Sequence, residues 1–361
     1  MTSQGSGLTM PIPEPDPDET QPSNVVFSDL HPRVGNRRLE IINGLQREQK
    51  RIDPKYFYDT RGSELFEQIT ELPEYYPTRT ERQILINNAQ AMSEFCPQNC
   101  VLIEPGSGSS EKVRLLLDSL EPAAYVPMDI SASYLERAAI QLAEEYPWLS
   151  VHAFCTDFAS QEKEPLGLPA GKRVIFYPGS TLGNMKPAAA IDFLRNLGRW
   201  LNTDGGVLIG IDMHKSTQTL EEAYNDEQGV TALFNLNILN NINNITGANF
   251  NVGNFRHYAF YNEDEYRIEM HLVSKVKQVV QLGDTDITIG QGEAIHTENS
   301  YKYTLERFRE MALSAGFAIR SSWSDAQQLF SVHYLELERS KAATDKIQPG
   351  TGNPDTGSAS D

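Results

Sequence analysis

Residues 101–112 of the chain read VLIEPGSGSSEK. The apolar run 101–103 predicts a short buried strand, and the Gly/Ser run 106–110 predicts a tight turn. The leucine-rich stripe from Val113 to Leu120 then predicts a helix. A strand, a glycine turn and a helix in this order form a unit of an open α/β sheet, which binds ligands at the carboxyl ends of its strands. This stretch therefore predicts both the fold class and the position of a ligand site.

The same alternation continues downstream. Strands are predicted at 125–129, 150–155, 174–177 and 206–211, and helices at 131–146 and from Pro187 to Leu201. Such alternation predicts a parallel, doubly wound, Rossmann-like sheet.

The pattern changes after Asp212. We expect helices over 215–250 and 304–315, longer strands over 255–282, and a terminal antiparallel pair formed by 317–323 and 330–337. By analogy of fold, a mostly parallel sheet that ends in an antiparallel hairpin is typical of S-adenosylmethionine-dependent methyltransferases more than of dehydrogenases.

Composition and charge exclude several classes of protein. The 361 residues include 31 Lys and Arg against 49 Asp and Glu, which gives a formal net charge of −18. Such a surface repels phosphate groups, so we expect neither nucleic acid nor membrane as a partner, but only a small-molecule substrate. No signal-peptide pattern and no run of about 18 apolar residues is present, so we expect a cytoplasmic protein, and a monomer.

The cysteines and histidines give no metal or disulfide pattern. Three cysteines cannot build a disulfide framework, and Cys96 and Cys100 have no second ligand pair nearby. His271, His296 and His333 fit no recognised spacing of ligands. We therefore expect no metal.

Polar residues follow the first three strands of the predicted parallel sheet. Gly106 and Gly108 allow the backbone to approach a ligand, and Asp129 ends the next strand, where a carboxylate can bind both ribose hydroxyls. Asp157 and Phe158 follow the third strand, where they can bind the adenine amino group and cover the ring. A dinucleotide would require a third glycine where Glu111 stands, so these residues favour S-adenosylmethionine, a sulfonium cofactor without phosphate.

Two further segments are rich in polar and aromatic residues. They are 56–81, which reads YFYDTRGSELFEQITELPEYYPTRTE, and 295–303, which reads IHTENSYKY. With these segments, the GSGSSEK turn, the GSTLGN loop and the RIEM segment, residues 35–338 closely resemble the histidine Nα-methyltransferase family of ergothioneine biosynthesis. The resemblance implies trimethylation of the α-amino group of histidine to hercynine with three S-adenosylmethionines.

The resemblance also implies a domain organisation. A methyltransferase domain is expected from 81–214 and 302–339, and a separate α+β substrate-binding domain from 25–80 and 215–301. Residues 1–24 and 340–361 are rich in Pro, Gly, Ser or acidic residues, and we expect a disordered leader and a disordered tail there.

The functional residues of the family can be carried over by position. For the cofactor, the resemblance implies contacts from Gly106, Ser107, Lys112, Asp129, Asp157 and Phe158, with Lys112 reaching the methionine carboxylate. For the substrate, it implies that Asn184 and Tyr224 hold the carboxylate and that Tyr58, Phe66 and Gly179 surround the amino group. Tyr75, Glu298 and Ser300 are then expected to face the imidazole. Met270 and Asn299 are expected at the imidazole end of the site. Tyr58 and Asn184 are the expected catalytic residues. Pro105 departs from the usual leucine, and Asn299 stands at a position that varies in the family.

The residues themselves leave other interpretations open. Glu298 and Ser300 are two apart, so an extended segment would point both to one face, where they can bind the two ring nitrogens of histidine. Glu298 could also be a surface or capping acid, Asn184 could end a loop, and Tyr75 could be a core aromatic. Alternative functions are an indole amino acid as acceptor, against which Glu298 and Met270 argue, a nicotinamide oxidoreductase, and a binding module without turnover.

Overall fold

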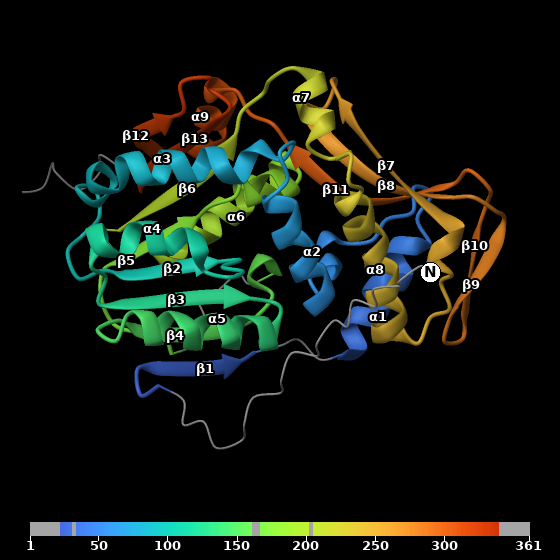
Figure 1. The fold of residues 1–361 in the computed structure, drawn as a ribbon, viewed down its shortest axis with the longest axis horizontal. Helices are drawn as coiled ribbons and strands as arrows, with labels where there is room; N and C mark the ends of the chain where they lie inside the picture. The colour runs from blue at the N-terminus through green and yellow to red at the C-terminus, as the bar shows by residue number, and fades with distance from the viewer. Residues whose placement is uncertain (1–21, 31–33, 161–166, 202–204, 339–361) are drawn as a thin grey trace, which may run out of the picture.

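The computed structural model describes residues 22–30, 34–160, 167–201 and 205–338 (Figure 1). One part is a large sheet with helices on both faces, and the other is a smaller region of helices and antiparallel strands beside it (Figure 1). Apart from residues 22–24, the predicted leader and tail lie outside the described residues. No helix in the described ranges is long and apolar enough to cross a membrane.

The large sheet confirms the predicted fold class. Its strand order is β1-β4-β3-β2-β5-β6-β13-β12, parallel from β1 to β6 and closed by the antiparallel β13 and β12. Strands β2 to β6 consist of apolar runs because helices bury them on both faces. The strands are β1 (Val25–Asp29), β2 (Val101–Pro105), β3 (Ala124–Asp129), β4 (Ser150–Cys155), β5 (Arg173–Tyr177), β6 (Gly206–Asp212), β12 (Phe317–Ser324) and β13 (Phe330–Leu337).

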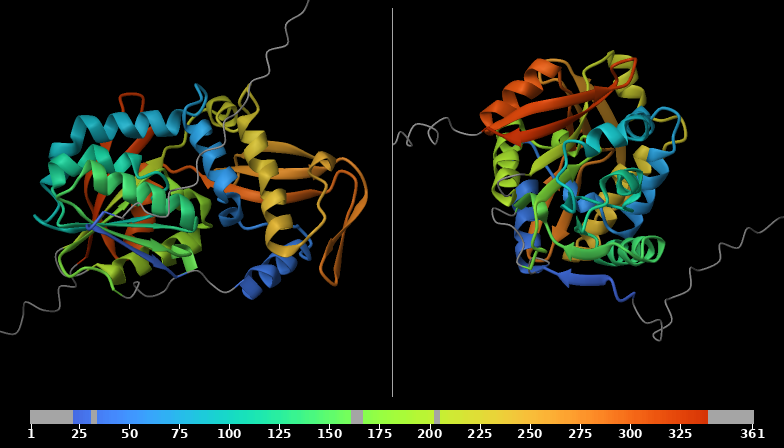
Figure 2. Two further views of the ribbon diagram at one scale, coloured as in Figure 1. Left: turned by 60° about the horizontal axis from the view of Figure 1, so that its bottom comes forward. Right: turned by 90° about the vertical axis from the view of Figure 1, so that its left-hand side faces the viewer.

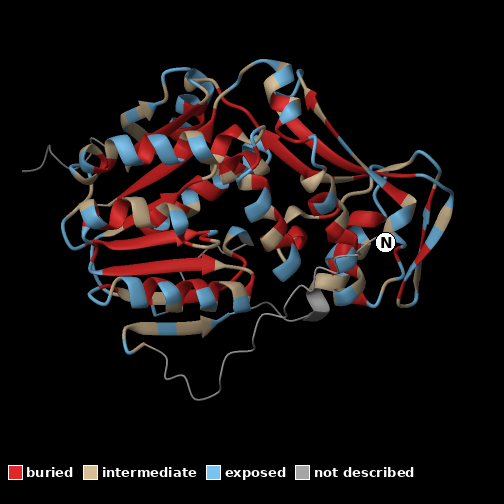
Figure 3. Cartoon of the chain, viewed as in Figure 1, coloured by how far each residue is buried: buried red, intermediate tan, exposed pale blue. Residues whose placement is uncertain are grey.

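Helices cover the two faces of this sheet with separate apolar cores. On one face lie α3 (Tyr76–Ser93), α4 (Glu111–Leu120) and α5 (Ala132–Glu145), and on the other lie α6 (Pro187–Trp200) and α9 (Leu305–Ser314). Figure 2 shows this layering, and Figure 3 shows that the strands between the helices are buried. The order of the strands reverses at β2, between β3 and β5, and in open α/β sheets such a reversal opens a crevice at the carboxyl ends of the strands.

The smaller region has its own core and contains the helices and long strands predicted over 215–250 and 255–282. A three-stranded antiparallel sheet, β11-β8-β7, packs on α8, and Phe57, Phe234 and Leu272 lie in the core between them. Its elements are α1 (Val34–Leu45), the 3-10 helix η1 (Pro54–Phe57), α2 (Thr60–Thr70), α7 (Thr217–Glu222), α8 (Val230–Thr246), β7 (Phe255–Asn262), β8 (Arg267–Ser274), β9 (Gln278–Leu282), β10 (Thr285–Ile289) and β11 (Ala294–Tyr301).

Two predicted domain boundaries need correction. Strand β1 pairs in parallel with β4, from Val25 with Val151 to Asp29 with Cys155, so residues 25–29 belong to the large sheet and not to the substrate-binding region. Helix α3 runs without a break through the predicted boundary at 80/81 and packs against α4 and β13. A proline in the first turn of α3 and an edge strand of five residues, none of them buried, give no local sign of these long-range contacts.

Candidate active site

Two loops flank the reversal of the sheet at β2. The turn after β2 contains Gly106, Gly108 and Ser110, all with left-handed φ angles of 75°, 53° and 56°. The loop after β5 contains Gly179, with φ 78°, and the 3-10 helix η3 (Thr181–Asn184). Both predicted ligand-binding loops therefore lie at the position where this fold binds its ligands.

The glycine turn is built for close approach to neighbouring groups. The backbone nitrogens of Gly106 and Ser107 donate to the carbonyl of Met128 at 2.7 and 3.0 Å, which ties the turn to β3. A Cβ at position 106 would lie 3.3 Å from the ring of Phe158, so the predicted aromatic cover rests directly on this glycine. The Ser107 hydroxyl is buried and has no hydrogen-bond partner among the described residues, so it remains available to a ligand.

The carboxylates that follow β3 and β4 differ in their surroundings. Asp129 accepts hydrogen bonds from the backbone nitrogens of Gly108 at 3.1 Å and Ser131 at 3.0 Å. Burial raises the pKa of Asp129, and these two hydrogen bonds oppose the rise. Asp157 lies 3.1 Å from the ammonium of Lys55, which comes from η1 in the smaller region. Asp157, one of the predicted cofactor residues, is therefore in contact with the smaller region.

Lys112 has a partner that the sequence did not indicate. Its ammonium lies 2.5 Å from the Glu81 carboxylate, which is fully buried and also accepts from the backbone nitrogen of Gly179. The carboxylate fits because Gly210 of β6 has no side chain, since a Cβ there would overlap Glu81 Oε1. Glu81 thus joins a predicted cofactor residue to a predicted substrate residue.

The aromatic residues predicted for the substrate form a continuous cluster. Tyr58 packs edge-on against Phe66 with centroids 5.9 Å apart, Phe66 against Tyr75 at 6.3 Å, and Tyr75 against Tyr224 at 6.3 Å. Phe234 of α8 packs against both Tyr58 and Phe66, and the sequence analysis missed it because it lies in a run of core residues. Burial raises the pKa of Tyr58 well above 10, so its hydroxyl stays protonated at neutral pH.

The asparagines of α8 hold the segment that carries Tyr58. Asn241 donates to the carbonyl oxygen of Tyr56 at 2.7 Å, and Asn237 donates to Asp59 at 2.8 Å. Asp59 in turn caps α2 through the backbone nitrogen of Gly62 at 2.7 Å. Tyr58 is therefore fixed on both sides by buried side-chain hydrogen bonds.

A β-bulge decides which face of β11 carries Glu298. His296 pairs with His271, but Glu298, two residues later, pairs with Met270, so one residue of β11 is unpaired between them. The extra residue turns Glu298 to the face of Met270, opposite to the face of His296. Without the bulge, Glu298 would point away from the tyrosines.

Glu298 is a buried carboxylate that no described residue binds. Its side chain makes no hydrogen bond to any described residue, and only 9% of the residue is exposed. Burial raises its pKa to about 8, although the charge of Lys302 lowers it. The charge of Glu298 in turn contributes to the raised pKa of Tyr58, Tyr75 and Tyr224, so Glu298 lies close enough to all three tyrosines to affect their ionisation.

Ser300 lies on the same face of β11, as the spacing predicted. Its hydroxyl accepts from Tyr224 Oη at 2.8 Å and from Lys302 Nζ at 2.8 Å. Lys302 also forms an ion pair with Asp212 at 2.7 Å, at the carboxyl end of β6. Lys302 and Asp212 were not predicted, although Lys302 lies within the polar segment 295–303.

The loop that carries Asn184 packs against the end of the same strand. A Cβ at Gly183 would come within 2.8 Å of the Tyr301 carbonyl oxygen, so η3 lies directly on β11. Asn299 differs from its neighbours because it pairs with Glu269, on the other face of the strand. Its Oδ1 atom is buried and has no partner among the described residues. The structure thus brings Asn184 close to this strand end but does not bring the Asn299 side chain to the Glu298 face.

The match to known proteins agrees with this arrangement. Residues 37–337 match the family described as histidine-specific, SAM-dependent methyltransferases. The chain belongs to this family. The predicted family and enzyme class are confirmed, and the oxidoreductase interpretation falls away.

Relatives of this histidine-specific methyltransferase align over most of the chain. It is 39% identical over 296 residues to the histidine N-alpha-methyltransferase of Mycolicibacterium smegmatis, which covers 80% of this chain and 91% of the relative. Identity to the protein of the same name from Mycobacterium tuberculosis is 40% over 295 residues, with the same coverage. Ergothioneine biosynthesis protein 1 of Neurospora crassa is 31% identical over 323 residues, covering 87% of this chain and 35% of that longer relative.

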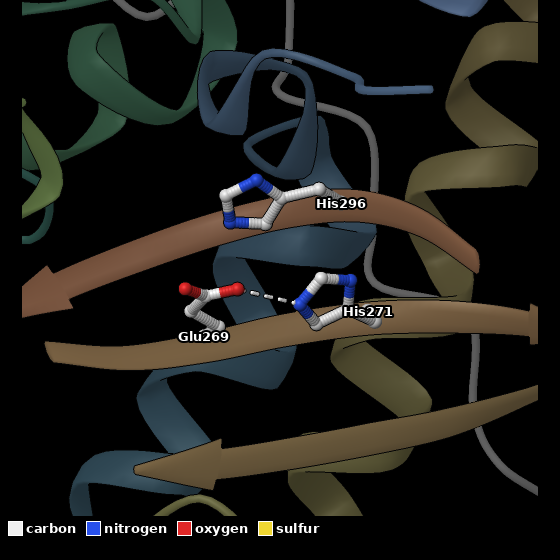
Figure 4. Close-up of side chains that lie close together, drawn as sticks. All are labelled: Glu269, His271 and His296. Carbon is white, nitrogen blue, oxygen red and sulfur yellow. Dashed lines mark hydrogen bonds and ion pairs between the residues drawn. The ribbon is translucent and has the colours of Figure 1, made fainter. Parts of the chain in front are cut away.

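A group of possible metal ligands lies on the β11-β8-β7 sheet of this methyltransferase, on the face opposite to Glu298. Glu269, His271 and His296 each offer an atom within 4.8 Å of the others (Figure 4). These donors are engaged: Glu269 binds Arg267 at 2.6 Å and His271 at 2.9 Å, and His296 Nε2 lies 2.9 Å from the carbonyl oxygen of Glu298. Because a guanidinium already occupies the carboxylate, we interpret the group as structural, with the stacked rings of His271 and His296, 4.8 Å apart, joining β8 to β11 at the bulge.

Proposed function

We propose that this chain transfers three methyl groups from S-adenosylmethionine to the α-amino nitrogen of L-histidine and so forms hercynine, the first step of ergothioneine biosynthesis. The observation that carries the proposal is the Glu298 side chain, which is buried, makes no hydrogen bond to a described residue and lies near three tyrosines. When ionised, this carboxylate can accept a hydrogen bond from a ligand, and an imidazole N–H is a donor of suitable size. Relatives at about 40% identity that are named for histidine support the same substrate.

The residues at the sheet reversal fit S-adenosylmethionine. Because Gly106 has no side chain, a ligand can approach the backbone of the turn beside the Phe158 ring. Asp129 has lone pairs left for a ribose diol. Lys112 is a cation for the methionine carboxylate, and the nearby acids Glu81 and Asp129 suit a positively charged sulfonium. When bound, the cofactor supplies an electrophilic methyl group and a neutral sulfide as leaving group.

The chain contributes alignment more than acid–base chemistry. The amine must be unprotonated to attack, so the site has to bind the free base and release one proton in each round. Tyr58 can accept a hydrogen bond from an N–H of the amine, and its raised pKa keeps it a neutral hydroxyl and not a phenolate base. Such positioning can lower a barrier by up to about 7–11 kcal/mol. Asn184 would hold the substrate carboxylate, whereas Tyr224, the other residue expected there, donates its one proton to Ser300 in this structure. The lack of a side chain at Gly179 leaves room for methyl groups.

Mass spectrometry tests the proposal. Purified protein is incubated with S-adenosylmethionine and either histidine or tryptophan, and the added methyl groups are counted. We expect three methyl groups on histidine and S-adenosylhomocysteine in a threefold molar amount. Faster methylation of tryptophan would favour the indole alternative, and cofactor binding without S-adenosylhomocysteine release would favour a binding module.

A further inference from the structure

Lys302 is a buried lysine with a complete set of partners. It follows the last residue of β11, and 1% of its side chain is exposed. Its three N–H donors face three oxygen atoms: Asp212 Oδ2 at 2.7 Å, Ser300 Oγ at 2.8 Å and Tyr224 Oη at 3.4 Å. Because an ammonium has three donors and no acceptor, these contacts fix its position and orientation.

Asp212 is the counter-ion that permits this buried ammonium. Its carboxylate also accepts from Tyr76 Oη at 2.8 and 2.9 Å and pairs with Lys215 at 2.5 Å. Burial alone would raise the pKa of Asp212, but the two ammonium groups outweigh burial and hold the pKa below its usual value. Asp212 therefore stays ionised and keeps Lys302 in place beside the substrate face of β11.

The contacts of Lys302 determine the direction of the hydrogen bonds around Ser300. A hydroxyl group has one proton to donate and two lone pairs that accept. Lys302 and Tyr224 both donate to Ser300 Oγ, which occupies its two lone pairs. The Ser300 proton has no acceptor among the described residues, so it remains free to donate to a ligand.

The result is a pair of unlike groups on one face of the strand. Glu298, when ionised, can only accept, whereas Ser300 in this network can only donate. A neutral imidazole matches the pair, because one ring nitrogen carries a proton and the other carries a lone pair. An indole offers a single donor and a thiophene offers no hydrogen-bonding nitrogen.

We propose that Lys302, held by Asp212, is a positioning residue that makes the Ser300 hydroxyl a hydrogen-bond donor to the substrate ring. The proposal rests on histidine being the substrate and adds how the ring is recognised. Lys302 acts through Ser300, without contact to the reacting amine. Removal of the ammonium frees a lone pair of Ser300 and lets its proton turn toward Tyr224.

A double-mutant cycle tests this coupling. Dissociation constants are measured by calorimetry, with S-adenosylhomocysteine bound, for histidine and for β-(2-thienyl)alanine, whose five-membered aromatic ring lacks both nitrogens. The proteins are wild type, Ser300→Ala, Lys302→Met and the double variant. We expect each single variant to lower the preference for histidine over the analogue about tenfold, as for loss of one hydrogen bond, and the double variant to lower it no further.

Other outcomes separate the possible failures. Equal weakening of both ligands in Lys302→Met, or a double variant whose loss is the product of the single losses, would overturn the proposal. If wild type does not prefer histidine, the proposed function fails instead. A rise in the melting temperature of a variant on addition of S-adenosylhomocysteine shows that the variant is folded. Should Lys302→Met not fold, Asp212→Asn takes its place in the same cycle, and an unchanged preference there also overturns the proposal.

Discussion

Both carboxylate oxygens of Glu81 lie 2.9 Å from the backbone nitrogen of Gly179. The same carboxylate pairs with Lys112 at 2.5 Å, and the residue is fully buried. One side chain from α3 therefore joins the first turn of α4 to the loop after β5, on the two sides of the sheet reversal. This contact gives a single residue influence over both predicted ligand sites.

The change Glu81→Gln tests this link. The amide cannot accept on both atoms, so one contact is lost and Lys112 loses its counter-ion. We expect affinity for S-adenosylmethionine and kcat/KM for histidine both to fall, each by about tenfold or more, because a hydrogen bond to a charged group contributes about 1.5–3 kcal/mol. Calorimetry and initial rates measure the two effects. The exposed Glu94→Gln at the end of the same helix is the control, and a Glu81→Gln variant that matches it would contradict the link.

Glu298→Ala separates recognition of the ring from binding of the cofactor. The change removes the carboxylate that is expected to bind the ring, so we expect kcat/KM for histidine to fall by roughly 10–100-fold. Glu298 lies on β11 and contacts none of the residues of the glycine turn. The dissociation constant of S-adenosylmethionine should change less than about twofold, which is within the ordinary scatter of a neutral substitution. The exposed Asp264→Asn in the β7–β8 turn serves as the control. Equal loss of substrate and cofactor binding would mean that Glu298 is structural.

Local sequence patterns predicted the central strands of the large sheet because these strands are buried on both faces, and because a glycine turn follows β2. The run 101–103 and the turn at 106–110 became β2 and the loop before α4. Strand β1 was assigned to the wrong region because its five residues, none of them buried, pair with β4 more than 100 residues away. A pairing between strands that are so far apart in the sequence cannot be recognised from the residues of one short segment.

The site shows the same division between local and long-range information. Alternation along β11 correctly predicted that Glu298 and Ser300 share a face, but the face itself depends on the bulge after His296. The contacts that hold the site together could not be predicted, because they join residues far apart in the sequence. Lys302 binds Asp212 across 90 residues of chain, and Glu81 binds Gly179 across 98. The resemblance supplied residues that are expected to contact ligands, whereas the structure adds residues that hold them in place.

Tyr58→Phe tests the alignment role of the hydroxyl. In the first two rounds the amine has an N–H that can donate a hydrogen bond to the Tyr58 hydroxyl oxygen, whereas a neutral tertiary amine has no N–H. We therefore expect the rate with histidine to fall by about tenfold, as for loss of one hydrogen bond, and the rate with Nα,Nα-dimethylhistidine to fall less. Timed mass spectrometry of both substrates measures this. Tyr258→Phe, an exposed tyrosine on β7, is the control, and a larger loss with the dimethylated substrate would refute the role.

The raised pKa of Glu298 makes the stability of the ligand-free protein depend on pH. Its pKa is about 8 in the folded chain against 4.5 for an ordinary glutamate, so the folded state binds the proton more tightly. The corresponding stability is fully present below about pH 4.5 and is lost as the pH rises through 8, by no more than about 5 kcal/mol. Glu298→Gln cannot ionise and should lack this part of the pH dependence. Urea unfolding of both proteins from pH 6 to 9 measures it: the wild type should lose stability relative to Glu298→Gln as the pH rises. Glu104, whose pKa is also about 8, is present in both proteins and cancels in the difference. A constant difference across this range would show that Glu298 is already ionised in the empty site.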